Sequence, residues 1–395
     1  MDQENFFDAD IFNVDMNAKI LNIIDELIIY MDKDFNIKWS NKTAQEYFSS
    51  SREELIDKKC YDKWGFSDFC FDCPVVKAKK TKNIEKTEMA KPNGHYWLMK
   101  AIPDLSENGE IKGIIEIARD ITDRKLYEKE LTRINNKLNR EYDRAEMLHN
   151  NLLPSELPQT KELKIAAYYE PAYRLGGDFY DFLEIENQII FYISDVSGHD
   201  LSSSMLNVFL KEAINSFIRA PECLGNTSKS KINIVDLTKF IKSTFENLGL
   251  PSDYFISLLV GVINVENNNI KICNAGIHCL PILLKSNEII NLENAGLPIT
   301  SLEGINFDYK ETVINLKPGE TFFAYTDGLI EQEIENNNDT ENRETFGEKR
   351  LIEVLEKNKD HSPAEIIEAV NCRLEKKKGD IEIQDDQTYI AIQHQ

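Results

Sequence analysis

The first third of the chain alternates short apolar stretches with polar turns. A helical pattern over Ala18–Leu27 leads into a strand at Leu27–Asp32, and Ile28–Lys38 predicts two strands around an Asp/Asn turn. After a mixed stretch, strands are expected at His95–Ile102 and Ile111–Asp120, joined by the turn Ser-Glu-Asn-Gly-Glu. The pattern predicts one domain of mixed helices and strands over residues 15–123, after a tail of residues 1–14.

Residues 124–155 follow a different period. Apolar residues recur at alternating spacings of four and three, with one interruption, at Tyr127, Leu131, Ile134, Leu138, Glu141, Ala145, Leu148 and Leu152. Such spacing predicts the seam of a coiled coil. The alternative is an amphipathic helix packed on its own domain, but a helix between two domains has little else to pack against. Pro154 and Pro158 are expected to end it.

The remaining residues, 156–395, group strands between helices, which predicts an α+β sandwich of sheets covered by helices. Strand patterns occur at Leu163–Tyr169, Phe179–Glu184, Ile189–Asp195, Phe255–Val265, Ile270–Asn274, Leu280–Lys285, Tyr309–Leu316, Phe322–Thr326 and Thr388–Ile392. Helical patterns occur at Leu201–Arg219, Val235–Leu248, Phe346–Glu356 and Pro363–Lys377. The acidic, Asn-rich segment Glu331–Asn342 is expected to be a loop of low complexity.

Composition narrows the function classes. The 395 residues are 42% hydrophobic and 29% charged, as in globular proteins of two or three domains. The formal charge of −22 disfavours nucleic acids and anionic membranes as partners. The acidic start lacks the pattern of a secretion signal, and the most apolar stretch, Tyr254–Val265, is too short to span a bilayer. We therefore expect a cytoplasmic protein with no membrane segment.

Carboxylates recur where apolar strands of the C-terminal region end. Asp178 and Asp327 each lie beside a glycine, Asp195 lies three residues before Gly198, and Asp385 and Asp386 lie beside each other. One such aspartate is most often part of a turn, but the recurrence at four places is hard to explain by turns alone. Buried carboxylates that converge need a shared cation, and oxygen ligands favour Mg²⁺ or Mn²⁺ over Zn²⁺. Two such ions, about 3.5–4 Å apart, suit in-line displacement at a phosphoryl group.

The same region carries a family resemblance. The strings LLPSELP, GGDFYDF, ISDVSGHDLSSSML, ICNAG, INLKPGETFFAYTDGLIE and DDQTYIAI occur in this order. Together they closely resemble the SpoIIE/RsbU-type serine phosphatases of the PPM, or protein phosphatase 2C-like, class. The resemblance implies an αββα sandwich, two Mn²⁺ or Mg²⁺ ions, and direct hydrolysis of phosphoserine by water that the ions activate.

The resemblance also implies residue roles. Asp178 is expected to bind one ion, and Asp195 to bridge both ions beside the backbone carbonyl of Val196. Asp327 and Asp385 would complete the second site, with Asp386 as the less certain member of its pair. Arg174, four residues before Asp178, is a candidate for orienting the substrate phosphate, although a lone arginine there is more often a surface residue.

The N-terminal domain resembles a PAS sensor domain. The resemblance rests on YMDKDFNIKWSN, on KPNGHYWLMKAIPDLSENGEIKGIIEIARDITDRK, and on the Asp-Ile-Thr motif that ends such domains. Within it, Cys60, Cys70 and Cys73 fall inside 14 residues, and Cys70 and Cys73 have the Cys-x2-Cys spacing of metal and redox sites. The cluster fits a metal, iron–sulfur or redox sensor, with His95 as a weak fourth ligand, or simply three thiols in a loop.

The other cysteines argue against thiol-based phosphate chemistry. They lack the Cys-x5-Arg spacing of cysteine phosphatases and are expected to be small buried apolar residues: Cys223, Cys273, Cys279 and Cys372.

Three functions compete. The first is a signal-regulated, homodimeric phosphatase that acts on a phosphorylated STAS-domain anti-sigma-factor antagonist in a partner-switching pathway, as the resemblance implies. The second is a diguanylate cyclase, since a PAS domain, a coil and GGD also begin such enzymes; Phe179 and Tyr180 replace the expected residues after GGD, and Asp327 and Asp385 would have no role. The third is an inactive binding module, which retention of all the acidic positions disfavours.

Overall fold

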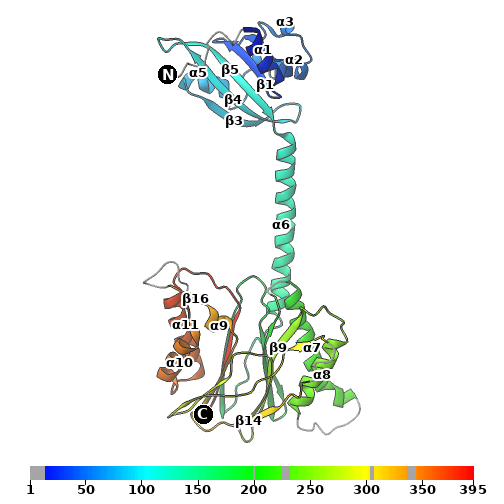
Figure 1. Ribbon diagram of the computed structural model, residues 1–395, viewed down its shortest axis with the longest axis vertical. Coiled ribbons are helices and arrows are strands. Elements are labelled where there is room, and N and C mark those ends of the chain that lie inside the picture. The colour runs from blue at the N-terminus through cyan, green and yellow to red at the C-terminus, as the bar shows by residue number, and fades with distance from the viewer. Residues whose placement is uncertain (1–13, 199–200, 224–231, 303–306, 336–343) are drawn as a thin grey trace, which may run out of the picture. The chain divides into compact units, whose positions relative to one another are not determined.

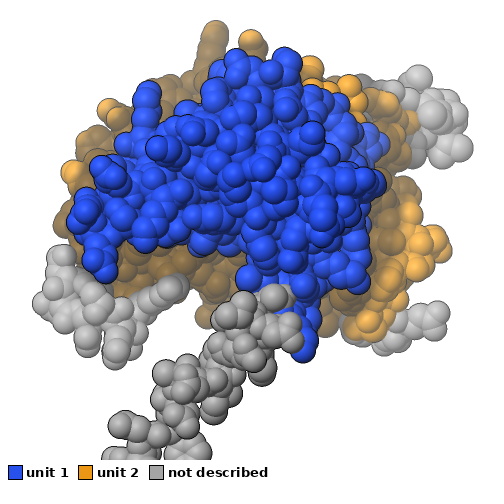
Figure 2. All heavy atoms as spheres, turned by 90° about the horizontal axis from the view of Figure 1, so that it is seen from above, with its two compact units in different colours: residues 1–138 blue, residues 139–395 orange. Residues whose placement is uncertain are grey.

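The computed structural model describes residues 14–198, 201–223, 232–302, 307–335 and 344–395. The chain forms two compact units, residues 1–138 and 139–395 (Figure 2). Residues 1–13 of the predicted tail, and residues 336–342 of the predicted low-complexity loop, lie outside the described residues.

The first unit is built on a five-stranded antiparallel sheet of order β2-β1-β5-β4-β3 (Figure 1). Its strands are β1 (Leu27–Asp32), β2 (Ile37–Ser40), β3 (Glu85–Ala90), β4 (Tyr96–Leu105) and β5 (Ile111–Asp120). Its helices are α1 (Val14–Ile23), α2 (Lys42–Tyr47), α3 (Arg52–Leu55), α4 (Cys60–Lys63) and α5 (Pro74–Thr81). Sequence patterning predicted β1 and β5 with these bounds, whereas α1 begins and ends four residues before its prediction.

The mixed stretch between β2 and β3 folds into short helices that local hydrogen bonds define. Asn41 caps α2 by accepting a hydrogen bond from the Ala44 amide at 3.0 Å. Ser51 and Glu54 form a capping box at the start of α3. Pro74 occupies the first turn of α5, where its missing N–H costs nothing. These helices lack the length that would give a readable period, which is why patterning did not resolve them.

A single long helix, α6 (Thr122–Asn150), follows β5. It ends two residues before the predicted last seam position, and Leu152 packs against the core of the second unit instead. The side chains of Tyr127, Leu131, Ile134, Leu138 and Leu148 are all more than half exposed. The structure shows one continuous helix, and the pairing of this seam with a second chain stays a prediction.

The second unit contains two antiparallel sheets. The first has the order β14-β10-β9-β8-β7, with β13 also paired to β9, and the second has the order β12-β11-β15-β18-β6. Strands of the first sheet are β7 (Phe179–Ile185), β8 (Gln188–Val196), β9 (Phe255–Asn264), β10 (Asn269–Ala275), β13 (Ile299–Thr300) and β14 (Glu311–Asn315). Strands of the second are β6 (Leu163–Glu170), β11 (Ile282–Leu284), β12 (Ile289–Asn291), β15 (Thr321–Tyr325) and β18 (Gln387–His394).

Helices cover the outer faces of both sheets (Figure 1). The first sheet carries α7 (Leu201–Cys223) and α8 (Ile234–Glu246), and the second carries α10 (Gly347–Asn358) and α11 (Pro363–Lys378). A short helix, α9 (Gly328–Glu331), follows β15, and β16 (Glu333–Ile334) pairs with β17 (Glu344–Thr345). The unit is therefore the αββα sandwich that the sequence predicted.

Alternating residues of β8 account for this layering. Ile189, Phe191 and Ile193 face the core between the sheets, whereas Ile190 and Tyr192 face the core under α7 and α8. The ring of Phe191 meets that of Phe322 from the opposite sheet with centroids 5.7 Å apart.

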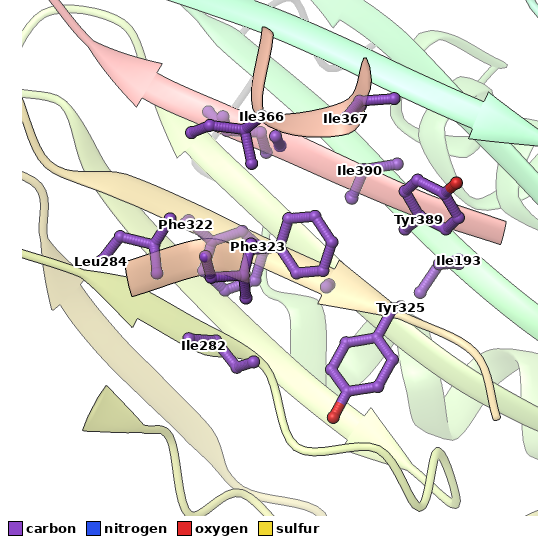
Figure 3. Packing of buried hydrophobic residues seen from close by; sticks show 14 of the residues in the cluster. Ile193, Ile282, Leu284, Phe322, Phe323, Tyr325, Ile366, Ile367, Tyr389 and Ile390 are labelled. Atoms are coloured by element: carbon purple, nitrogen blue, oxygen red, sulfur yellow. The ribbon is translucent and has the colours of Figure 1, made fainter. Parts of the chain in front are cut away.

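The second sheet repeats this arrangement on its own outer face. Residues of β15 and β18 pack there with Ile366 and Ile367 of α11 (Figure 3). Both sheets are thus buried on two faces, and their strands contain nearly continuous apolar runs.

Within the described residues, no helix combines the length and the apolar character that a membrane crossing requires.

Candidate active site

Strand pairing brings the predicted aspartates to one end of each sheet. In the first sheet, Phe179 of β7 lies opposite Ser194 of β8, so the preceding Asp178 and the following Asp195 flank the same end of the pair. In the second sheet, Tyr325 of β15 lies opposite Tyr389 of β18. Asp327 follows β15 and Asp385 precedes β18, so this pair shares an end in the same way.

Asp178 ties the two sheets together. Its side chain is 2% exposed, and its Oδ2 accepts hydrogen bonds from the Thr388 hydroxyl at 2.6 Å and the Thr326 hydroxyl at 2.7 Å. Both threonines belong to the second sheet's end. The hydrogen bonds fix the orientation of the carboxylate and partly offset the cost of burying it.

The carboxylate of Asp386 accepts hydrogen bonds from backbone amides of the segment that leads to Asp178. Its Oδ1 accepts a hydrogen bond from the Ala172 amide at 2.8 Å, and its Oδ2 accepts bonds from the amides of Gly177 at 2.6 Å and Asp178 at 3.2 Å. The neighbouring Asp385 is exposed. The structure thus separates the members of this pair: Asp386 holds the loop that carries Asp178, and Asp385 is the outward carboxylate.

Glycines allow these segments to approach one another. A Cβ atom on Gly177 would lie 2.6 Å from the carbonyl oxygen of Val196, so that carbonyl borders the Asp178 loop directly. A Cβ atom on Gly328, next to Asp327, would collide with the Asp386 carbonyl. The Gly-Gly-Asp and Asp-Gly motifs therefore act through close backbone packing as well as through their carboxylates.

The electrostatics of the site are those of crowded negative charge. Burial, and then the charges of Asp327, Asp385 and Asp386, raise the pKa of Asp195 to about 7. The pKa of Asp178 is raised by burial and then by Asp195 and Asp386, while its two threonine donors lower it. Each ionised carboxylate makes the others costlier to ionise, and a cation at this position would relieve that cost.

The donor set fits hard divalent cations. Asp178, Asp195, Asp327, Asp385 and the Val196 carbonyl offer oxygen atoms only, as Mg²⁺ and Mn²⁺ prefer. Asp327 makes no side-chain cap to α9, although it stands at that helix's first turn. Among the described residues, no three His, Cys, Asp or Glu side chains are arranged to hold a metal ion. The carboxylates thus act on one another without converging on one point.

The side chain of Arg174 pairs with α6 and not with the aspartates of the site. Its guanidinium pairs with Asp143 of α6 at 2.6 Å and also donates to the Asn139 carbonyl at 3.4 Å. Both side chains of the pair are about half exposed or more. In this structure Arg174 connects the loop before Asp178 to the last part of α6.

Three polar residues at the site were not singled out from the sequence. Thr326 and Thr388 hold Asp178, and Asn207 of α7 donates to the Gly177 carbonyl at 3.1 Å. The threonines lie inside the Tyr-Thr-Asp-Gly and Asp-Asp-Gln-Thr strings, so their position in those motifs was the available signal. Asn207 had no such signal, because its role depends on how α7 packs.

The cysteine cluster of the first unit is buried but does not include His95. Cys60, Cys70 and Cys73 are 5%, 8% and 9% exposed. His95 is instead bonded to Asp120 at 2.8 Å on the exposed part of the unit.

The second unit's cysteines divide by burial. Cys273 and Cys279 are buried as expected, whereas Cys372 is exposed because it lies on the outer face of α11. Cys223 ends α7 at the edge of the described residues.

Comparison with known families and structures identifies the fold of both units. Residues 185–395 match the family described as Stage II sporulation protein E (SpoIIE), and residues 21–126 match the PAS fold. The second unit has a protein phosphatase 2C-like fold: the SiaA-PP2C domain of Pseudomonas aeruginosa superposes with a TM-score of 0.55 at 19% identity, covering 66% of this chain and 98% of that one. The chain therefore combines a PAS fold with a protein phosphatase 2C-like fold, and it belongs to the SpoIIE family.

Two curated relatives extend the match. Protein IcfG of Synechocystis is 29% identical over 243 residues, which are 55% of this chain and 36% of IcfG. Phosphoserine phosphatase RsbU of Bacillus subtilis is 25% identical over 207 residues, which are 51% of this chain and 57% of RsbU. The matches span less than two thirds of either relative's length.

Proposed function

We propose that this protein is a metal-dependent phosphoserine phosphatase whose activity is regulated through its PAS domain. The observation that carries the proposal is the gathering of Asp178, Asp195, Asp327 and Asp385 from four chain segments at the ends of two sheets, where the pKa of Asp195 is raised to about 7 by burial and by its acidic neighbours. Membership of the SpoIIE family supports it, as does similarity to RsbU, itself described as a phosphoserine phosphatase.

In this proposal the side chains divide into ligands and supports. Asp178, Asp195, Asp327, Asp385 and the Val196 carbonyl would hold two Mn²⁺ or Mg²⁺ ions, and such ions would supply an activated water and positive charge for the phosphate. Thr326 and Thr388 orient Asp178 through the hydrogen bonds to its Oδ2. Asp386 fixes the Gly177–Asp178 backbone, which keeps the Asp178 carboxylate beside the end of β8.

The substrate proposed is the phosphoserine form of a STAS-domain anti-sigma-factor antagonist in a partner-switching pathway. Its support is the similarity to RsbU and IcfG together with the PAS domain, which suits an enzyme that answers a signal.

We also propose that the chain forms a parallel homodimer through α6. The exposed seam of Tyr127, Leu131, Ile134, Leu138 and Leu148 has the four–three spacing that two helices bury against each other. Such a coil would pass a change in the PAS domain to the second unit, since α6 begins directly after β5 and ends beside the Asp178 loop through Asp143 and Arg174.

The test is Mn²⁺-dependent release of phosphate from a phosphoserine-bearing STAS protein. Asp327→Asn removes one proposed ligand and is expected to lower turnover at least about 100-fold, because loss of a ligand exceeds the 10–100-fold typical of its supporting residues. Asp308→Asn is the matched control, since Asp308 has an 81% exposed side chain outside the proposed site. Its rate should equal that of the unaltered protein.

The alternatives give different results. An unchanged rate in Asp327→Asn would refute its metal role. Conversion of GTP to a cyclic dinucleotide would favour a cyclase, and correct folding without any turnover would favour an inactive binding module.

A further inference from the structure

The core of the PAS unit contains a cluster of polar groups. Glu116 is a charged residue, but it lies on the same face of β5 as the buried Ile114 and Ala118 and is itself only 1% exposed. Lys91, directly after β3, is 4% exposed. Burial of a lysine and a glutamate costs several kcal/mol unless their charges are matched nearby, so both side chains need partners within this core.

The two cysteines of the Cys-x2-Cys motif lie against this cluster. Cys73 is the N-cap residue of α5, and although its side chain makes no capping hydrogen bond, the N–H groups of Val75 and Val76 lower the pKa of its thiol. The two thiols act on each other, since their interaction raises the pKa of Cys70 and lowers that of Cys73. The motif thus forms a paired dithiol at a helix N-terminus.

Lys91 connects the dithiol to Glu116. Its Nζ lies 3.7 Å from the Cys70 sulfur and 4.2 Å from the centroid of the Trp64 ring. The Trp64 indole N–H in turn donates to Glu116 Oε1 at 3.0 Å. The buried lysine therefore has a thiol on one side and, across an aromatic ring, a carboxylate on the other.

This arrangement distinguishes between the two uses of a Cys-x2-Cys motif. A metal ion held by Cys70 and Cys73 would stand beside the Lys91 charge and would be repelled by it. The same charge favours a thiolate. The pKa of Cys73 is lowered to about 6, chiefly by the hydrogen bond from Cys70, then by the N–H groups of Val76 and Val75 and by Lys91, in spite of burial.

Cys60 is not a third partner of the same kind. Burial raises the pKa of its thiol, and the charges of Glu116 and Cys73 raise it further, so it stays a neutral thiol.

We propose that Cys70 and Cys73 form a redox pair that reacts with hydroperoxides, with Cys73 as the attacking sulfur and Cys70 as the resolving one. The Cys73 sulfur attacks one peroxide oxygen, the O–O bond breaks, and Cys73 becomes a sulfenic acid as the other oxygen leaves and takes a proton to become water. The Cys70 sulfur then attacks Cys73, its proton leaves with the hydroxyl as a second water, and the S–S bond forms. Two thiols lose two electrons in total, and hydrogen peroxide gains them.

Oxidation of the pair changes the charge around a residue of β5. Formation of the disulfide removes the negative charge of Cys73, which raises the pKa of Glu116. The ionised form of Glu116 then becomes easier to reach, and its attraction to Lys91 becomes stronger. Glu116 stands on the strand that leads through Ile121 into α6. The oxidation state of the pair is thereby linked to the strand that precedes the linker helix, independently of whether the second unit is a phosphatase.

The experiment uses the full-length protein and hydrogen peroxide. Reduced protein is exposed to a small molar excess of peroxide, free thiols are alkylated, and the tryptic peptides are analysed by mass spectrometry. Cleavage after Lys63 and Lys77 yields a peptide of residues 64–77 that contains Cys70 and Cys73 and no other cysteine. We expect this peptide to lose two hydrogen atoms and both alkylation sites, reversibly with dithiothreitol, while Cys372 remains alkylated.

Variants assign the roles of the two sulfurs and the lysine. Cys70→Ser should stop at a sulfenic acid on Cys73, which a dimedone probe captures, whereas Cys73→Ser should leave Cys70 a free thiol. Lys91→Met should slow the reaction by about tenfold or more, and Lys91→Arg should retain most of it, because the charge is kept. Cys372→Ser is the control and should not change the rate. All three tryptophans lie in this unit, so their fluorescence reports whether each variant is folded.

Three results would overturn the proposal. The first is full alkylation of residues 64–77 at a peroxide concentration that already oxidises Cys372. The second is an equivalent of metal bound to the purified protein that is lost in Cys70→Ser. The third is equal rates for Lys91→Met and the unaltered protein.

Discussion

At the scale of single residues, Asp178 depends on groups that do not themselves bind a ligand. Thr388 and Thr326 both donate to its Oδ2, which leaves Oδ1 oriented by the same two bonds. Removing one hydroxyl frees the carboxylate to rotate and leaves a buried oxygen with one donor fewer. The cost should therefore appear in metal binding before it appears in folding.

We predict that Thr388→Val lowers the affinity for Mn²⁺ by about 10–100-fold, the usual effect of losing such a support. The measurement is the Mn²⁺ concentration for half-maximal turnover, together with calorimetric binding of Mn²⁺ to the protein alone. Thr388→Ser keeps the hydroxyl and should restore most of the affinity. An unaltered Mn²⁺ requirement in Thr388→Val would show that the hydrogen bond does not support the site.

Glu116 predicts a pH dependence of stability in the first unit. Burial, and then the charge of Cys73, raise its pKa to about 7, although Lys91 and Trp64 act in the opposite direction. A carboxyl group whose pKa is raised in the folded state stabilises the fold at low pH, and this contribution is lost as the pH rises through about 7. Between pH 4.5 and 8 the loss amounts to about 3 kcal/mol.

Glu116→Gln should remove most of this slope. Glutamine retains an acceptor for the Trp64 indole but carries no charge, so the variant should be more stable than the unaltered protein at pH 8 and similar at pH 5. Urea unfolding followed by tryptophan fluorescence measures this unit alone, since Trp39, Trp64 and Trp97 all lie in it. Parallel pH profiles for the two proteins would contradict the assignment.

The aspartates of the proposed site show how far sequence reasoning reaches. That Asp178, Asp195, Asp327 and Asp385 lie at strand ends could be predicted, because a carboxylate at the end of an apolar strand is costly and therefore informative, and their metal roles stay predictions. The division of labour between Asp385 and Asp386 was not accessible, because it depends on which side chain turns toward the Gly177 amide. Which of the two side chains turns inward depends on three-dimensional packing, and the spacing of residues in the sequence does not reveal it.

At the scale of elements, long strands were predictable and most of the shortest ones were not. Strands β8 and β9 were located within one residue at each end, because buried runs of Ile, Val, Leu and Phe have few alternatives. The strands β12, β13, β16 and β17 have three residues or fewer, and their pairing is set by neighbours rather than by their own pattern. The αββα order nevertheless followed from the long elements alone.

Helix α6 gives a prediction about association. If its exposed seam pairs two chains, Leu131→Glu combined with Ile134→Glu places like charges in the interface and should convert a dimer into a monomer. Light scattering after size-exclusion chromatography over a concentration series measures the molar mass. Asn136→Glu combined with Asn139→Glu adds the same charge away from the seam and should leave the mass unchanged. A monomer in the unaltered protein at all concentrations would refute the coil.

At the scale of the whole molecule, each unit has its own core. The clusters of the second unit contain no residue before Leu152, and the cluster of the first ends at Ala118. A chain whose cores do not share residues is expected to fold in independent parts. Sensing and chemistry can then be separated by cutting the chain between them.

Deletion of residues 1–123 tests this separation. The remaining chain keeps all but the first two residues of α6 and both cores of the second unit, so it should unfold cooperatively by circular dichroism. Its Mn²⁺-dependent turnover should stay within about threefold of the basal rate of the full-length protein. It lacks Cys70 and Cys73, so peroxide should no longer alter that turnover, whereas the full-length protein should respond. A shortened chain that folds but has no basal turnover would mean that the first unit completes the catalytic site, and the modular interpretation would then fail.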